Sequence, residues 1–249
     1  MMRMRLIVKM VCAALAVGTL ASGADARAAG WPQSNDEPAV RLPEGEFVYN
    51  LPCKVINVHP EQPGKALMFV WLHGGVRDQK LHDFFIHNHL DNCAADDSVV
   101  HYLKRHGLKA VVLMPMCHKA AKTECVVWSD CWPEVKRMID DYVDKGLVDP
   151  RRIYLAGSSD GGRGTWDYVE SHADVFAAAI AMSCEGPRMT RVPTFFFNTN
   201  DEPDCTAQSR AMQDRGSNII EYVRYDGSHG DDAALCDESL LMRFFGYTK

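Results

Sequence analysis

The feature that most constrains the fold of this 249-residue chain is a glycine-flanked serine that directly follows a short apolar run. Residues 153–155 are Ile-Tyr-Leu, which suits a buried strand, and residues 157–161 read Gly-Ser-Ser-Asp-Gly. A helical apolar pattern follows. Between a strand and a helix, the pattern Gly-x-Ser-x-Gly forms a strained turn that presents its serine at the top of a sheet. We therefore predict that Ser159 is a nucleophile; the alternative is a glycine turn without chemistry.

Apolar stretches and amphipathic stretches alternate along the rest of the chain, and this predicts an α/β fold. The central sheet is expected to be mainly parallel with helices on both faces, and the length suits a single domain. The segment between residues 182 and 192 is too short for a large cap domain, which predicts an open cleft. Strands are predicted at 46–58 (an opening antiparallel pair), 66–72, 109–115, 152–156, 176–182, 192–197 and 219–225, and helices at 96–107, 133–146, after the serine turn, 207–215 and 239–245.

The first 28 residues have the composition of a secretory signal peptide. A basic head carrying Arg3, Arg5 and Lys9 precedes an apolar stretch at 11–20, and small residues surround a cleavage site at 26–28. The apolar stretch is short for a retained membrane anchor, which is the alternative. We expect a signal peptide at 1–28, an extended arm at 29–45 and a folded domain at 46–249, which predicts a secreted or periplasmic protein.

The charge of the chain restricts its partners. The full sequence has a formal net charge of −6, and loss of the basic first segment makes the mature chain more acidic. An acidic surface argues against nucleic acid as a partner and against stable membrane association.

The cysteines predict disulfide bonds in an exported chain. Of the nine cysteines, Cys12 lies in the signal segment, so an even number remains. Cys125 and Cys131 flank a short polar turn and can close a local loop, but spacing does not decide the pairing. The alternative is that several are buried thiols. The segment 116–132, which carries three of the cysteines, can line a substrate cleft or form a stapled surface loop.

A second glycine turn, His73-Gly74-Gly75, ends the apolar run at 66–72. A tetrahedral intermediate develops negative charge, which fixed backbone N–H donors stabilise. We predict an oxyanion hole made by the backbone at Gly74 and Gly75 together with Asp160, the residue after the proposed nucleophile. The alternative is a plain turn.

The partners of Ser159 are expected downstream, in the order acid and then histidine. Asp201 stands just after a predicted strand and is our first candidate for the acid; Glu202 and Asp204 are rivals. His229 is the only histidine after Asp201, and it lies in a loop that follows another strand. His229 would take the proton of the Ser159 hydroxyl, while the carboxylate fixes the tautomer of the ring.

The predicted mechanism needs no cofactor and no metal. A cluster of His82, His87 and His89, with acidic residues nearby, makes a metal site conceivable because imidazole and carboxylate are common ligands. A polar, solvated loop at the rim of the cleft explains the same residues, and we predict no metal site.

These motifs together resemble a known group of proteins. The chain is similar to secreted α/β-hydrolases related to polyhydroxybutyrate depolymerases, feruloyl and acetylxylan esterases, and a set described as predicted peptidases. The resemblance implies the α/β-hydrolase fold and a serine esterase with Ser159, Asp201 and His229 as its triad. It rests on residues 72–75, 114–117, 148–155, 157–166, 176–178, the turn at Asp201 and residues 225–229.

Two departures from the pattern of this group bear on activity. Asn198-Thr199 stands where members often have His-Gly before the acid. Asp160 replaces the Met or Gln that commonly follows the nucleophile, and a carboxylate that points into an oxyanion hole would oppose the developing charge.

The open cleft and the signal peptide favour a secreted carboxylic-ester hydrolase. Its substrate would be an acylated carbohydrate or a similar polar ester, either a small molecule or linked to a polymer. A serine peptidase of the same fold is one alternative, because the same triad cleaves amides. A binding protein that kept the fold and lost turnover is another, and Asp160 and the altered turn before the acid motivate it. The oligomeric state does not follow from the sequence.

Overall fold

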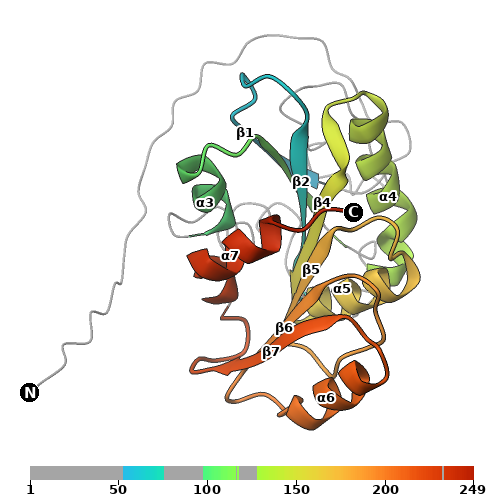
Figure 1. Cartoon of the computed structure of the whole chain (residues 1–249), viewed down its shortest axis with the longest axis vertical. Coiled ribbons are helices and arrows are strands. Elements are labelled where there is room, and N and C mark those ends of the chain that lie inside the picture. The colour runs from blue at the N-terminus through green and yellow to red at the C-terminus, as the bar shows by residue number, and fades with distance from the viewer. Residues whose placement is uncertain (1–52, 76–97, 116, 118–127, 232) are drawn as a thin grey trace, which may run out of the picture.

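A twisted sheet of seven strands runs through the protein (Figure 1). The computed structural model describes residues 53–75, 98–115, 117, 128–231 and 233–249. The predicted signal peptide, the arm at 29–45, the first half of the opening strand pair and the three clustered histidines lie outside these residues.

The strand order in the sheet is β1-β3-β2-β4-β5-β6-β7. β1 is antiparallel to β3, and every other neighbouring pair is parallel, so the prediction of a mainly parallel sheet is confirmed. The strands are β1 (Cys53–Val58), β2 (Ala66–Leu72), β3 (Ala110–Pro115), β4 (Val148–Ser158), β5 (Ala178–Met182), β6 (Thr194–Thr199) and β7 (Ile219–Tyr225).

Helices cover both faces of this sheet, as predicted. α3 and α7 pack on one face, while α4 and α5, with α6, pack on the other (Figure 1). No helix forms between β5 and β6, where a cap would be inserted. The helices are α3 (Val99–Arg105), α4 (Trp128–Asp144), α5 (Asp160–Ser171), α6 (Thr206–Asp214) and α7 (Glu238–Phe245), with a short 3-10 helix at Ala233–Cys236.

The central strand β2 shows why the sheet needs two layers of helices. All seven of its residues are buried. Phe69 and Trp71 pack in the cluster below α3 and α7, whereas Met68 and Val70 pack against α4 and α5. Because successive side chains of a strand point to opposite faces, a continuous apolar run is stable only when both faces are covered.

Two elements begin earlier than the sequence predicts. α4 starts at Trp128 and includes Pro133, which was expected to open the helix. The indole Nε1 of Trp128 donates to the carbonyl oxygen of His73 at 3.1 Å, and the Tyr168 hydroxyl donates to the carbonyl oxygen of Trp128 at 2.7 Å. These tertiary contacts hold a helical turn before the proline. β4 starts at Val148 because Val148 pairs with Ala66 of β2 across an irregularity in the ladder.

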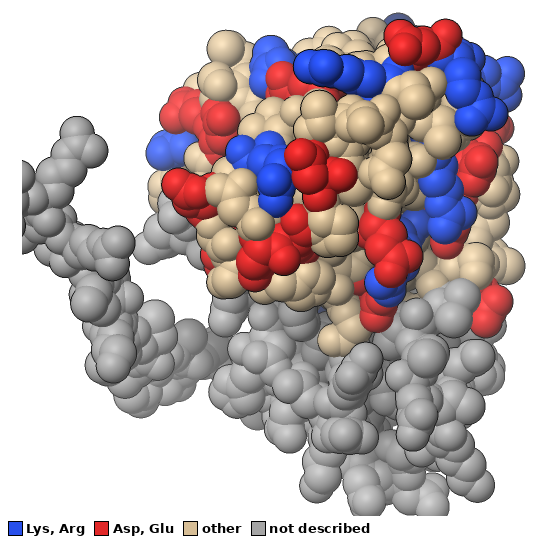
Figure 2. Space-filling model, turned by 90° about the horizontal axis from the view of Figure 1, so that it is seen from below, with Lys and Arg blue, Asp and Glu red and all other residues tan. Residues whose placement is uncertain are grey.

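The surface carries both signs of charge. Acidic and basic side chains are interspersed over the face shown in Figure 2. In the part of the chain that the structure describes, no helix combines the length and the apolar character that crossing a bilayer requires.

Candidate active site

Ser159 sits at a sharp turn between the end of β4 and the start of α5. Its backbone has φ 56° and ψ −117°, a region that residues with a side chain seldom occupy. Its N–H donates to the Met182 carbonyl oxygen of the neighbouring strand β5 at 3.0 Å. The strand, turn and helix therefore meet in the arrangement that presents a serine hydroxyl above a sheet.

The glycines of the motif are required by close approach of backbone to backbone. A Cβ atom at Gly161 would lie 1.9 Å from the carbonyl oxygen of Leu72, and one at Gly157 would lie 2.3 Å from the carbonyl oxygen of Gly161. Both distances are far below van der Waals contact. Any side chain at these positions would push α5 away from β2 and β4, so the glycines fix the position of Ser159.

His229 contacts the Ser159 hydroxyl. Its Nε2 lies 2.9 Å from Oγ of Ser159, although the two residues are 70 positions apart in the sequence. The loop after β7 carries the ring to this place, and 57% of the His229 side chain is exposed. This distance lies within the hydrogen-bond range needed for proton transfer.

Glu202 is the carboxylate that contacts the other ring nitrogen of His229. Its Oε1 lies 2.6 Å from Nδ1, and the second oxygen accepts the Thr199 N–H at 2.7 Å. The Glu202 side chain is only 8% exposed. The structure thus places the predicted rival at the ring, and not our first candidate, Asp201. The turn after β6 explains the difference: it points the two neighbouring side chains in different directions, and the longer glutamate reaches the ring.

Asp201 holds the histidine loop through its backbone. One carboxylate oxygen accepts the N–H of His229 at 3.2 Å, and the other accepts the hydroxyl of Thr199. The hydrogen bond from Thr199 is the main reason that the pKa of Asp201 lies below its usual value. Asp201 therefore positions the loop, whereas Glu202 orients the ring.

Asp204, the third carboxylate in this stretch, forms hydrogen bonds with the first residue of α6. One of its oxygens accepts the N–H of Thr206 at 2.9 Å and its hydroxyl at 2.6 Å, and the hydroxyl contact is the main cause of a lowered pKa at Asp204. This is the pattern of a residue that satisfies a free N–H at the start of a helix. Asp204 has no contact with His229 among the described residues.

Two side chains, one of them buried, support the turn that carries Glu202. Asn198 has no exposed surface, and its amide donates to the carbonyl oxygens of Cys184 and Pro203 at 3.3 and 3.2 Å. Arg224 of β7 donates to the carbonyl oxygens of Asn200 and Glu202, both at 3.0 Å. Asn198 departs from the residue expected by resemblance, yet it ties the acid turn to the segment that follows β5.

The buried ring of His73 holds its own turn in place through two hydrogen bonds. Nε2 of His73 accepts the N–H of Cys117 at 3.0 Å, so the proton of the neutral ring belongs on Nδ1, which lies 2.5 Å from the carbonyl oxygen of Gly74. The His73 side chain is buried, while Gly75 is exposed at the rim. The side chain of His73 thereby fixes the direction of the peptide that leads to Gly75.

Asp160 meets this turn directly. A Cβ atom at Gly75 would lie 2.5 Å from Oδ2 of Asp160, so the carboxylate packs on the Gly75 backbone. Its other oxygen, Oδ1, pairs with the guanidinium of Arg163. The structure brings two of the three predicted oxyanion-hole residues, Gly75 and Asp160, side by side, while the carbonyl oxygen of the third, Gly74, contacts the His73 ring.

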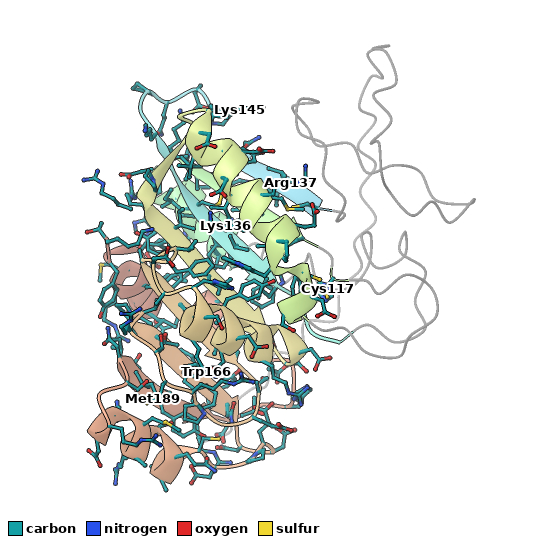
Figure 3. All side chains as sticks on the ribbon, turned by 90° about the vertical axis from the view of Figure 1, so that its right-hand side faces the viewer. Cys117, Lys136, Arg137, Lys145, Trp166 and Met189 are labelled. Atoms are coloured by element: carbon teal, nitrogen blue, oxygen red, sulfur yellow. The ribbon has the colours of Figure 1, made fainter. Side chains whose placement is uncertain are left out.

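No disulfide joins two of the six cysteines that the structure describes. Two of them are nonetheless close: Sγ of Cys117 lies 2.9 Å from Sγ of Cys131, beside the first turns of α4 (Figure 3). The contact with Cys117 is the main cause of a lowered pKa at Cys131. The suggested pairing of Cys131 with Cys125 involves a residue outside the described part of the chain.

Among the described residues, no group of histidine, cysteine, aspartate and glutamate side chains is arranged to hold a metal ion. The histidines for which a metal site was considered, His82, His87 and His89, lie outside those residues.

Comparisons with known proteins bear on the fold. No protein-family model matches the chain, and no curated protein does. A solved structure described as a thermostable esterase is 21% identical with a TM-score of 0.60, over 80% of this chain. The match spans 60% of that esterase, so this chain corresponds to only part of its length.

Two further solved structures are similar. One, described as a ferulic acid esterase, is 17% identical with a TM-score of 0.50, over 72% of this chain and 83% of the other. The second is an alpha/beta hydrolase enzyme from the metagenome of sediments of the Mar Chica lagoon, Morocco. It is 14% identical with a TM-score of 0.51, over 78% of this chain and 94% of its own. Together with the parallel sheet and its two helical layers, these similarities show that the chain has the α/β-hydrolase fold.

Proposed function

We propose that this protein is a serine hydrolase that cleaves carboxylic esters through an acyl-enzyme. The observation that carries the proposal is the chain of two contacts from the Ser159 hydroxyl to Nε2 of His229 and from Nδ1 of His229 to the Glu202 carboxylate, at 2.9 and 2.6 Å. A hydroxyl, an imidazole and a carboxylate in this sequence of contacts form the arrangement that activates a serine for acyl transfer.

Each side chain has a defined role in this mechanism. Oγ of Ser159 attacks the carbonyl carbon of the ester while Nε2 of His229 takes the hydroxyl proton. The Glu202 carboxylate, which accepts the hydrogen bond from Nδ1, stabilises the imidazolium that results. The same proton then passes to the departing alkoxide, which leaves as an alcohol. Water, activated in the same way by His229, releases the carboxylic acid and restores Ser159.

The negative charge of each tetrahedral intermediate needs fixed donors. The N–H of Asp160 is suited to this role because it stands at the start of α5, where a helix leaves its first N–H groups without intrahelical acceptors. Gly75 lies against Asp160 on the same side of the cleft, and its N–H is the proposed second donor. Gly74 precedes it in the turn held by His73.

The substrate proposed is an ester of a polar compound, such as an acylated carbohydrate, either free or linked to a polymer. The connection between β5 and β6 carries no helix that covers the site, and the His229 side chain is 57% exposed. Asp160, the residue after Ser159, pairs with Arg163, which in turn pairs with Glu185, so charged side chains stand beside the nucleophile. One structural neighbour is described as a ferulic acid esterase, which supports an ester as the substrate.

We also propose that the protein is exported, because residues 1–28 have the composition of a signal peptide.

A fluorophosphonate probe tests the proposed nucleophile. The purified protein is expected to be labelled at Ser159, because phosphonylation requires a hydroxyl activated by a base. Ser159→Ala is expected to abolish labelling, whereas Ser158→Ala, which removes the neighbouring hydroxyl in the same motif, is expected to retain it. Absence of labelling in the folded wild type would refute the hydrolase proposal and favour a binding protein.

Rates with a panel of substrates test the reaction. A soluble acetyl ester, a feruloyl ester and a peptide amide of similar size are compared for the wild type and for Ser159→Ala. Hydrolysis of either ester, lost in the variant, supports an esterase. Hydrolysis of the amide with no turnover of either ester would replace the esterase proposal with a peptidase.

A further inference from the structure

We infer that Arg163 is a positioning residue, whose guanidinium makes an acidic residue at position 160 compatible with an oxyanion hole. The inference rests on the proposed function, because it concerns the charge that develops when Ser159 attacks an ester. It explains how this chain tolerates Asp160, the departure that motivated the alternative of a protein without turnover.

The carboxylate of Asp160 lies where it opposes catalysis if nothing balances it. Its Oδ2 packs on the backbone of Gly75, while the N–H of the same residue is the proposed oxyanion donor. The side chain is only 29% exposed, so water screens it incompletely. A fixed negative charge beside a developing negative charge raises the energy of the transition state.

Arg163 supplies the balancing charge. It follows Asp160 by one helical turn, and its Nη1 pairs with Oδ1 of Asp160, which leaves Oδ2 toward Gly75. The backbone N–H of Arg163 donates to the carbonyl oxygen of Ser159 at 3.0 Å, so α5 fixes the backbone from which the guanidinium extends. The opposite side of the guanidinium reaches Glu185 at 3.3 Å, but Glu185 is 80% exposed and its charge is largely screened.

Two consequences follow from this geometry. Without the guanidinium, the Asp160 carboxylate would remain beside Gly75 with its full charge, and it would be free to turn toward the N–H donors. With a neutral residue at position 160, no carboxylate could turn toward those donors, so the guanidinium would have nothing to hold away from them. The importance of Arg163 should therefore depend on whether residue 160 is charged.

A cycle of variants tests this dependence. kcat for a soluble acetyl ester is measured for the wild type, Arg163→Gln, Asp160→Asn and the double variant. Acylation and deacylation both pass through an oxyanion, so kcat reports the effect whichever step is slower. Arg163→Gln is expected to lower kcat about 10-fold and to change KM less than about twofold, since the charge develops only in the transition state. In the Asp160→Asn background, the same change is expected to lower kcat less than about twofold.

Arg188→Gln is the matched control. Arg188 pairs with Asp167, another carboxylate of α5, and the exposed fractions of this pair, 44% and 29%, are close to the 47% and 29% of Arg163 and Asp160. It should leave kcat within about twofold of the wild type, because Asp167 does not adjoin the Gly75 turn.

The outcomes separate this inference from the proposed function. If the wild type cleaves esters through Ser159 but Arg163→Gln has the same effect in both backgrounds, Arg163 acts only through the structure of α5 and the inference is wrong. An effect no larger than that of Arg188→Gln would also overturn it. If the folded wild type has no hydrolase activity and no labelling at Ser159, both the proposed function and the inference are refuted.

Discussion

The two halves of the candidate active site are built in opposite ways. The half that carries Ser159 consists of a strand, a turn and a helix in direct backbone contact. Gly157 and Gly161 permit this contact because they have no side chain. The half that carries Glu202 and His229 consists of loops after β6 and β7, joined by side-chain hydrogen bonds. Close backbone packing, which leaves no room for a side chain at the glycines, holds the first half in place. Hydrogen bonds between polar side chains and loop backbone hold the second.

The change with the largest expected effect is Gly161→Ala, which breaks the first half. The new Cβ would lie 1.9 Å from the Leu72 carbonyl oxygen, in backbone that cannot move aside cheaply. We expect the free energy of unfolding to fall by about 4 kcal/mol or more, measured by urea denaturation. At Gly186, where the nearest atom would lie 3.9 Å from a Cβ, alanine is expected to cost less than about 0.5 kcal/mol. Equal stability of the two variants would show that backbone contact does not hold the turn.

Glu202→Gln is expected to have the next largest effect, on activity and not on stability. It keeps the shape of the side chain but removes the charge that stabilises the His229 imidazolium, so kcat for an ester should fall by about 10³-fold. Asp201→Asn, which alters the neighbouring carboxylate, is expected to lower kcat by less than about 10-fold. The reason is that Asp201 contacts the backbone N–H of His229 and not its ring. If the two effects were reversed, Asp201 would be the acid of the triad, as the sequence first suggested.

This pair of residues marks the limit of what the sequence predicts. The continuous apolar run of β2 requires a sheet covered on both faces, and the glycines around Ser159 require close backbone packing, so the fold and the serine turn follow from local sequence. The choice between Asp201 and Glu202 depends on how a turn directs two adjacent side chains toward a ring from another loop. The residue type alone carries no signal for that choice.

The early start of α4 was missed for the same reason. Pro133 is a good local signal for the beginning of a helix, yet Trp128 forms hydrogen bonds with residues far along the chain and adds a turn before the proline. The antiparallel pairing of β1 with β3, and not with β2, which follows it in the sequence, is likewise a tertiary result.

A disulfide between Cys117 and Cys131 would add a covalent bond beside the site, joining the residue whose N–H holds the His73 ring to α4. The two sulfur atoms lie 2.9 Å apart, and the lowered pKa of Cys131 favours its thiolate, which is the form that attacks a disulfide. With oxidised glutathione as the oxidant, two exchange steps would join the two sulfur atoms and release two molecules of reduced glutathione. The bond should raise the free energy of unfolding by about 3 kcal/mol, as expected for a loop of this length.

Peptide mapping by mass spectrometry checks this disulfide. A digest without reduction is expected to contain one linked pair of peptides that carries Cys117 and Cys131, and Cys131→Ser should remove both the linked pair and the gain in stability. A linkage of either cysteine to Cys125 instead would contradict the assignment.

The smallest expected effect is on Tm: the contribution of Asp201 to stability should depend on pH. Hydrogen bonds, the one from Thr199 first, hold the pKa of Asp201 below its ordinary value of 3.8. A carboxyl whose pKa is lower in the folded than in the unfolded state stabilises the fold above its unfolded pKa and loses that contribution as the pH falls through the folded pKa. Asp201→Asn should therefore lower Tm slightly at about pH 6, and the difference from the wild type should shrink toward about pH 3. Asp214→Asn, at the exposed end of α6, is the control. If the difference instead grew as the solution became more acidic, the hydrogen bonds from Thr199 and His229 would not hold Asp201 as an anion, and the second half would owe its shape to its other hydrogen bonds.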